Sequence, residues 1–129
     1  MSLVSAPSAR ERAGTLFAAL DAGNIDAFAR LFAPDAVQRI GDRPPMHGRE
    51  EIRAGNSAFL ASIAGLHHTI EEAWEAGNTV IYKLAVEYHL LDGSTINLGT
   101  VTVVRYAEAG EIESLEVYFG CAPTFGAAH

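Results

Sequence analysis

Apolar residues in the first part of the chain recur at the spacing of an amphipathic helix. Between Ala9 and Leu20 they return every three or four positions, which places them along one face of a helix. The stretch Asp21–Asn24 then interrupts the pattern. Gly23 within it suits a helix end, because glycine adopts the left-handed backbone conformation without strain. The sequence therefore predicts a first helix that ends at this stretch.

Two more helices are predicted before the pattern changes. Residues 25–32 are mostly apolar at helical spacing, and Pro34 ends this short helix because the residue before a proline avoids helical geometry. A short run with β-branched residues, Ala36–Ile40, predicts a first strand, and Gly41–Pro45 predicts a loop. A third helix is expected over Arg49–Ile63, where apolar residues again return at helical spacing.

After the third helix the period changes to the alternation of half-buried strands. Turn residues at Gly77-Asn78 and Asp92-Gly93 favour hairpins. The expected strands are Leu66–Glu75, Val80–Leu91, Thr95–Tyr106 and Ile112–Phe119. Helices segregated from a run of antiparallel strands define the α+β class. Strands of about twelve residues are long for a flat sheet, so we expect three N-terminal helices packed on a curved, mainly antiparallel sheet.

Composition and charge exclude several classes of protein. The chain has 129 residues, with 9 Lys+Arg against 16 Asp+Glu and a formal net charge of -7. This length fits one domain over residues 1–129. The acidic excess opposes binding to nucleic acid or to an anionic membrane surface. No stretch approaches the roughly 18 apolar residues of a membrane span, and the first residues lack the pattern of a secretory signal. We expect a cytoplasmic protein that binds neither nucleic acid nor membranes.

The sequence does not favour a metal site or an internal disulfide. Cys121 is the only cysteine, which excludes an internal disulfide and a four-cysteine zinc site. His67 and His68 are adjacent in a predicted strand and point to opposite faces, so they are not expected to bind one metal ion. The other histidines show no ligand spacing. We expect neither a metal nor a cofactor.

A curved sheet under one layer of helices leaves room for an internal pocket. Concave, mostly apolar cavities with a few polar groups are typical of small-molecule sites. The inward faces of the helices and strands give the expected lining, in which threonine and tyrosine hydroxyls supply the polar contacts. These residues are Leu16, Phe17, Ile40, Phe59, Tyr82, Thr100, Thr102, Leu115, Val117 and Phe119. The expected partner is a small, largely hydrophobic molecule.

The order of these elements resembles the SnoaL-like branch of the nuclear transport factor 2-like superfamily. The stretches that carry the resemblance are Leu16–Asp26, Leu31–Ala36, His47–Ile52, Val103–Tyr106, Gly110–Ile112, Tyr118-Phe119 and Ala122-Pro123. They cover nearly the whole chain and consist mostly of structural motifs. The resemblance implies a cone-shaped half-barrel that is usually dimeric. It leaves the activity open, because the superfamily includes isomerases, cyclases, hydrolases, dehydratases and proteins without catalytic activity.

The same resemblance argues against two specific activities. Ketosteroid isomerases use an aspartate base together with a tyrosine and a protonated aspartate. Aligned on the shared motifs, the tyrosine falls on Leu16, the base on or beside Ile40, and the protonated aspartate on Thr102. None of the three matches, so ketosteroid isomerase activity is not expected. The hydrolase branch needs an arginine between two carboxylates, and no aspartate neighbours Arg105.

Three residues are candidates for chemistry in the pocket. His68 is a candidate base, because imidazole titrates at about 6.5. Asp42 lies in the loop that would rim the pocket, and the Tyr88 hydroxyl could donate to a ligand oxygen. The alternatives are a histidine bonded to a main-chain carbonyl, a turn aspartate bonded to its own backbone, and a tyrosine that fills the core.

Alternation along its strand sets the expected surroundings of His68. Its face also carries Leu66, Ile70, Glu72 and Trp74. On this reading Glu72 orients the imidazole ring, acts as a buried acid or points to water.

The outward face of the sheet carries apolar residues of its own. They are Ile81, Ala85, Val101, Val103 and Tyr118. Contiguous apolar patches on soluble proteins mark interaction surfaces, so we expect a homodimer that forms through this face.

Three functions remain open from the sequence. The first is a cofactor-free enzyme, such as an isomerase, cyclase or hydrolase, that acts on a small, largely apolar molecule through His68. The second is a binding protein that holds such a molecule without reaction, which the absent carboxylates favour. The third is an interaction module that uses the sheet as its docking surface.

Overall fold

The computed structural model describes residues 9–119, which form three helices followed largely by strands. The helices are α1 (Ala9–Asp21), α2 (Ile25–Arg30) and α3 (Gly48–Ala61). The strands are β1 (Phe32–Ile40), β2 (Met46–His47), β3 (Gly65–Ala76), β4 (Thr79–His89), β5 (Thr95–Tyr106) and β6 (Ile112–Phe119). The predicted α+β class is confirmed. Among the described residues, no helix is long and apolar enough to span a membrane.

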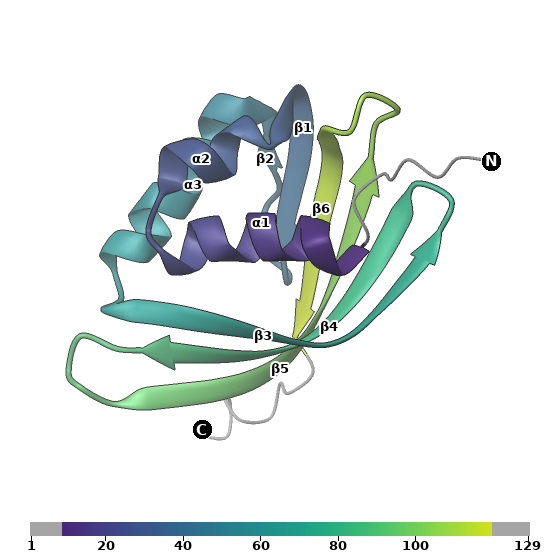
Figure 1. Ribbon diagram of the computed structural model, residues 1–129. Coiled ribbons are helices and arrows are strands. Elements are labelled where there is room, and N and C mark those ends of the chain that lie inside the picture. The colour runs from purple at the N-terminus through teal and green to yellow at the C-terminus, as the bar shows by residue number, and fades with distance from the viewer. Residues whose placement is uncertain (1–8, 120–129) are drawn as a thin grey trace.

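The six strands form one mixed sheet in the order β2-β1-β6-β5-β4-β3. Every pair is antiparallel except β1 and β6, which run parallel and join the first long strand to the last. The parallel pair and the short strand β2 were not predicted. Figure 1 shows the helices on one side of the sheet, with α1 beside β3 and α3 beside β1. The cone-shaped curvature of the sheet stays a prediction.

The core lies between these helices and the facing side of the sheet. Phe28 of α2 and Phe32 of β1 are fully buried and meet edge-on, with ring centroids 5.0 Å apart. Ile52 of α3 and Leu84 of β4 are buried in the same cluster. Full burial of such side chains contributes about 1.5–3 kcal/mol each to folding. The apolar helix faces therefore pack on the sheet as their spacing predicts.

The prediction that Leu31 and Phe32 continue the second helix is wrong. Helix α2 ends at Arg30, and Phe32 already pairs with Ile112 of β6. Pro34 thus lies inside β1 rather than at the end of a helix. The register between β1 and β6 shifts between Phe32 and Val37. A proline has no N–H for a sheet ladder and is tolerated at such an irregularity.

A second correction concerns the faces of β3. The register between β3 and β4 shifts between Ile70 and Glu72, so an extra residue interrupts the alternation. Beyond this bulge Glu72 lies opposite Lys83, and Trp74 lies opposite Ile81. Both side chains are exposed and point away from the helices. The prediction that they share the face of His68 is therefore wrong, and Glu72 does not orient that ring.

Candidate functional site

A cavity of about 410 Å³ lies between the helices and the inner face of the sheet. Its lining is mostly apolar. Several residues expected at a pocket line this cavity: Phe17, Ile40, Phe59, Thr100, Thr102, Leu115, Val117 and Phe119. The three candidate catalytic residues, His68, Asp42 and Tyr88, also contribute to the lining.

Leu16 and Tyr82 do not line the cavity, in contrast to the prediction. Both are buried in the core. Phe17 contacts the Tyr82 ring edge-on at 5.7 Å between centroids, and Phe17 itself lines the cavity. The Tyr82 hydroxyl lies 3.4 Å from that of Tyr106. Tyr82 thus fills space behind the cavity wall, because its hydroxyl meets another core tyrosine instead of a ligand.

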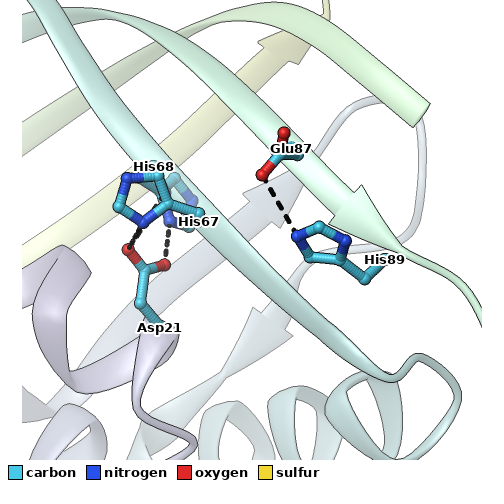
Figure 2. Close-up of polar contacts among 5 residues, drawn as sticks. All are labelled: Asp21, His67, His68, Glu87 and His89. Atoms are coloured by element: carbon cyan, nitrogen blue, oxygen red, sulfur yellow. Dashed lines mark hydrogen bonds and ion pairs between the residues drawn. The ribbon is translucent and has the colours of Figure 1, made fainter. Parts of the chain in front are cut away.

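His68, in the cavity lining, makes a short polar contact with Asp21. The Nδ1 atom of His68 lies 2.6 Å from Oδ1 of Asp21, and the backbone N–H of His68 donates to Oδ2 of the same carboxylate at 3.0 Å. Figure 2 shows the Asp21 carboxylate at the end of its helix, directed at β3. Both carboxylate oxygens are thus bonded to one residue. This geometry fixes the position of the imidazole ring.

The contact also determines the tautomer of His68. An ionised carboxylate only accepts hydrogen bonds, so Nδ1 carries the proton and Nε2 keeps a free lone pair. Among residues 9–119 no hydrogen bond to Nε2 is found. The Phe17 ring stacks on the imidazole, with centroids 4.7 Å apart and an angle of 30° between the planes. A ring held in this way has one nitrogen, Nε2, that can accept a proton.

Burial lowers the pKa of His68 below its ordinary value of 6.5, because the charged ring loses solvation. The hydrogen bond that His68 donates to Asp21 and the negative charge of Asp21 raise this pKa, but burial outweighs them. At neutral pH the pair is therefore a hydrogen bond between a neutral imidazole and a carboxylate rather than an ion pair. As the pH falls below 6.5, His68 is protonated in the unfolded chain before it is protonated in the folded protein. The contribution of neutral His68 to the free energy of unfolding is therefore fully present above pH 6.5 and is lost as the pH falls.

His67 approaches the same carboxylate from outside. Its Nδ1 atom lies 3.6 Å from Oδ2 of Asp21, and its side chain is 66% exposed against 9% for His68. Two adjacent strand residues reach one carboxylate because Asp21 lies at the edge strand β3 (Figure 2). Within residues 9–119 no group of three or more His, Cys, Asp or Glu residues has the arrangement of a metal site.

The remaining candidates occupy different parts of the site. Asp42 is exposed, next to Arg43, at the solvent-facing part of the lining. Tyr88 packs edge-on against Phe59 at 6.1 Å between ring centroids. Burial raises the pKa of Tyr88, which keeps its hydroxyl protonated and able to donate. Arg105 is exposed and donates to Glu116 at 3.3 Å, outside the cavity lining.

Sequence reasoning missed three polar residues of the site. It assigned Asp21 only to a helix end, although an acidic residue at the end of an amphipathic helix is placed to reach a neighbouring strand. Gln38 and Asn56 are buried and line the cavity. Their positions in the sequence could have indicated that they face the core. Gln38 lies on the same face of β1 as Ala36 and Ile40, and Asn56 interrupts the apolar face of α3.

Replacement of Asp21 by asparagine is expected to lower the pKa of His68 further. Both contributions of Asp21 raise this pKa, and asparagine removes the charge while it keeps the size of the side chain. A pH titration followed by nitrogen NMR of the imidazole measures the change. Asp26→Asn is the control, because Asp26 pairs with Arg53 on an exposed surface. A His68 pKa that is unchanged or higher in Asp21→Asn would contradict the expected role of Asp21.

The sequence model of the SnoaL-like domain matches residues 13–115. The chain belongs to the SnoaL-like family. This confirms the family that the sequence motifs resemble. Because family members differ in their chemistry, membership fixes the fold rather than the reaction.

Two solved structures are similar to this SnoaL-like chain. One is a protein of ketosteroid isomerase-like fold from Catenulispora acidiphila DSM 44928, in complex with trimethylamine. It is 26% identical, with a TM-score of 0.80 over 88% of each chain. The other is the epoxide hydrolase/cyclase-like enzyme SalBIII of pyran ring formation in the polyether salinomycin. It is 19% identical, with a TM-score of 0.76 over 86% of this chain and 89% of that one, and the likeness is one of fold.

Proposed function

We propose that this SnoaL-like protein is a cofactor-free enzyme that transfers a proton on a small, largely apolar molecule bearing a carbonyl group. The observation that carries the proposal is the 2.6 Å contact between His68 Nδ1 and Asp21 at the wall of a cavity of about 410 Å³. A neutral imidazole whose second nitrogen is free, oriented by a carboxylate, is a suitable general base. A related protein of the same fold holds trimethylamine, which supports a small-molecule cavity.

The proposed reaction starts with removal of a proton from the carbon next to the carbonyl group. The C–H bond breaks, the proton moves to Nε2 of His68, and the electron pair passes into the carbonyl oxygen as an enolate forms. Asp21 stabilises the imidazolium ion. The Tyr88 hydroxyl donates a hydrogen bond to the enolate oxygen. Tyr88 suits this role because it lies two residues beyond Val86, the residue opposite His68, on the same face of the sheet. In a substrate with a carbon–carbon double bond next to that carbon, the enolate is a dienolate; return of the proton from Nε2 to its γ-carbon re-forms the carbonyl group, shifts the double bond into conjugation and completes an isomerisation.

Hydrogen exchange of β-tetralone in D₂O tests this proposal. The protons between its aromatic ring and its carbonyl group are acidic, and their replacement by deuterium is followed by proton NMR. The protein is expected to accelerate exchange about 10²-fold or more over the same concentration of free imidazole. If the protein binds β-tetralone and exchange stays at the level of free imidazole, the catalytic proposal is wrong.

A non-catalytic binding protein is the second candidate. The mostly apolar lining and the absence of the ketosteroid isomerase carboxylates favour it. Native mass spectrometry of freshly purified protein distinguishes a binding protein from an enzyme by whether a ligand stays bound. A binding protein is expected to retain its ligand as an added mass, whereas an enzyme releases its product.

A homodimer through the outer face of the sheet is part of the proposal. The apolar residues expected there are joined by Trp74, which the bulge in β3 turns outward. Trp74 is 48% exposed and Tyr118 is 49% exposed, and Val101 lies opposite Tyr118 in the neighbouring strand. Ile81 lies between Trp74 and Val103 in register. Contiguous apolar side chains of this kind are stabilised when a second copy covers them.

Val101→Glu is expected to convert this dimer into a monomer. The substitution places a charge in the middle of the outer apolar face, where a partner would have to desolvate it. Sedimentation velocity over a range of concentrations measures the change. Leu91→Glu is the matched control, because Leu91 is 70% exposed at the turn between β4 and β5. A wild-type protein that sediments as a monomer at every concentration would rule out the dimer.

A further inference from the structure

Gln38 and Asn56 form a hydrogen-bonded amide pair in the wall of the cavity. Both side chains are almost fully buried, at 3% and 4% exposure, and both line the cavity. The Nδ2 atom of Asn56 donates to Oε1 of Gln38 at 2.6 Å and to the carbonyl oxygen of Ile52 at 2.7 Å. The carbonyl oxygen of Ile52 only accepts, so it fixes which end of the Asn56 amide is the donor. The orientation of both amides follows from this one contact.

This arrangement leaves specific atoms for a ligand. Both N–H hydrogens of Asn56 are used, and the oxygen of Gln38 accepts one of them. The Nε2 atom of Gln38 keeps two N–H donors, and among residues 9–119 no acceptor for them is found. Such a donor in a mostly apolar lining gains a hydrogen bond only when an acceptor enters the cavity.

A second polar group, on Thr100, also favours a ligand that can form hydrogen bonds. The Thr100 hydroxyl is buried, belongs to a residue that lines the cavity, and has no hydrogen-bond partner in the described part of the chain. Gln38 lies on β1 and Thr100 on β5, with β6 between these strands. Two residues of the lining, on different strands, therefore have a hydrogen-bonding group without a partner among the described residues. A purely hydrocarbon ligand would leave both of them unpaired.

The charges of the lining limit the chemistry of the acceptor. The charged residues in the lining are Asp42 and Arg43, both exposed, together with the titratable His68. Gln38 is buried whereas Arg43 is exposed, so a carboxylate held at Gln38 would lose its solvation, which is unfavourable. A neutral carbonyl oxygen accepts the two amide hydrogens without that penalty. Gln38 also lies four strands from His68, because β6, β5 and β4 separate β1 from β3.

We propose that Gln38 binds a neutral carbonyl oxygen of the substrate at the end remote from His68, and that Asn56 positions the Gln38 amide for this contact. The inference rests on the proposed function and adds the substrate class. The substrate has two oxygens, one at the reacting carbon near His68 and a second, uncharged one at Gln38. Gln38 selects such molecules against hydrocarbons and carboxylates of the same shape.

Three derivatives of β-tetralone test the proposal. They carry an acetyl, an isopropenyl or a carboxylate group at the same position of the aromatic ring. Acetyl and isopropenyl differ only in an oxygen that replaces a methylene group. Amide NMR titration of the wild-type protein is expected to give about 5- to 10-fold tighter binding of the acetyl compound than of the isopropenyl compound, which corresponds to one hydrogen bond. The carboxylate is expected to bind most weakly.

Gln38→Met is expected to remove the preference for the acetyl compound. Methionine has a similar length and no donor, so the ratio of the two dissociation constants approaches one while isopropenyl binding is retained. Retained binding of the isopropenyl compound also shows that the variant is folded. Asn56→Ala frees the Gln38 amide to rotate and is expected to reduce the ratio. Thr69→Val, on the exposed face of β3, is the control and keeps the wild-type ratio.

The possible outcomes distinguish a failure of the Gln38 proposal from a failure of the proposed enzyme activity. Equal binding of the acetyl and isopropenyl compounds by the wild-type protein overturns the role of Gln38, and the exchange activity of His68 can still hold. A preference that survives in Gln38→Met also overturns it. Selective binding without exchange supports the oxygen site and contradicts the enzyme. Failure of all three compounds to bind overturns both proposals.

Discussion

His68→Gln is expected to reduce β-tetralone exchange to the level of buffer, a fall of about 10²–10⁴-fold. Glutamine has a similar reach and can keep a hydrogen bond to Asp21 through its amide N–H. It has no group that accepts a proton near neutral pH, so the base is removed while the wall of the cavity is preserved. The exchange rate by proton NMR and the dissociation constant of β-tetralone are measured together. The rate is expected to fall while binding changes little, since the lost interaction belongs to the transition state.

His67→Gln is the matched control for this prediction. His67 is the neighbour of His68 in the chain and approaches the same Asp21 carboxylate, but its side chain is 66% exposed. Its replacement is expected to leave exchange within about 2-fold of the wild-type rate, because surface substitutions have small effects. Equal losses in the two variants would show that Asp21 or the local fold, rather than the His68 ring, controls the rate. Wild-type exchange in His68→Gln would exclude His68 as the base.

The strands of the fold were predicted best where local pattern and turn chemistry agree. The boundaries of β5 (Thr95–Tyr106) and β6 (Ile112–Phe119) match the prediction, because alternation within each strand and the turns around it are local properties. The bulge in β3 was missed. A bulge is determined by pairing with β4, and the sequence of a single strand does not reveal which residue is left unpaired.

In the site, too, the sequence predicts features that depend on neighbouring residues but not contacts between distant parts of the chain. The inward position of His68 follows from alternation before the bulge, so the pattern alone suggested this residue. Its partner Asp21 lies 47 residues earlier in the chain, and the contact depends on how α1 packs beside β3. The Gln38–Asn56 pair likewise joins residues 18 positions apart on a strand and a helix. Residue type and periodicity locate such groups on the inner face without identifying their partners.

Phe32→Ala is expected to lower the free energy of unfolding by about 3–5 kcal/mol. Phe32 is fully buried, its ring meets Phe28 at 5.0 Å, and it begins β1 directly after α2. Its carbonyl oxygen accepts two hydrogen bonds from the Arg49 guanidinium, at 3.0 and 2.6 Å, so the surrounding backbone is held in place and collapses little. A cavity left by the missing ring therefore stays open. Denaturation with urea at a fixed protein concentration measures the loss.

Leu91→Ala is the control for Phe32→Ala, because Leu91 is 70% exposed and its truncation is expected to change stability by less than about 0.5 kcal/mol. Phe32 does not line the cavity, so the expected loss of stability comes from the packed core. If Phe32→Ala were to lose less than about 1 kcal/mol, neighbouring side chains would have to fill the space. That result would mean that α2 and β1 are not held as rigidly as the Arg49 contacts indicate, and that the cavity wall near Phe28 can move to adjust to a ligand.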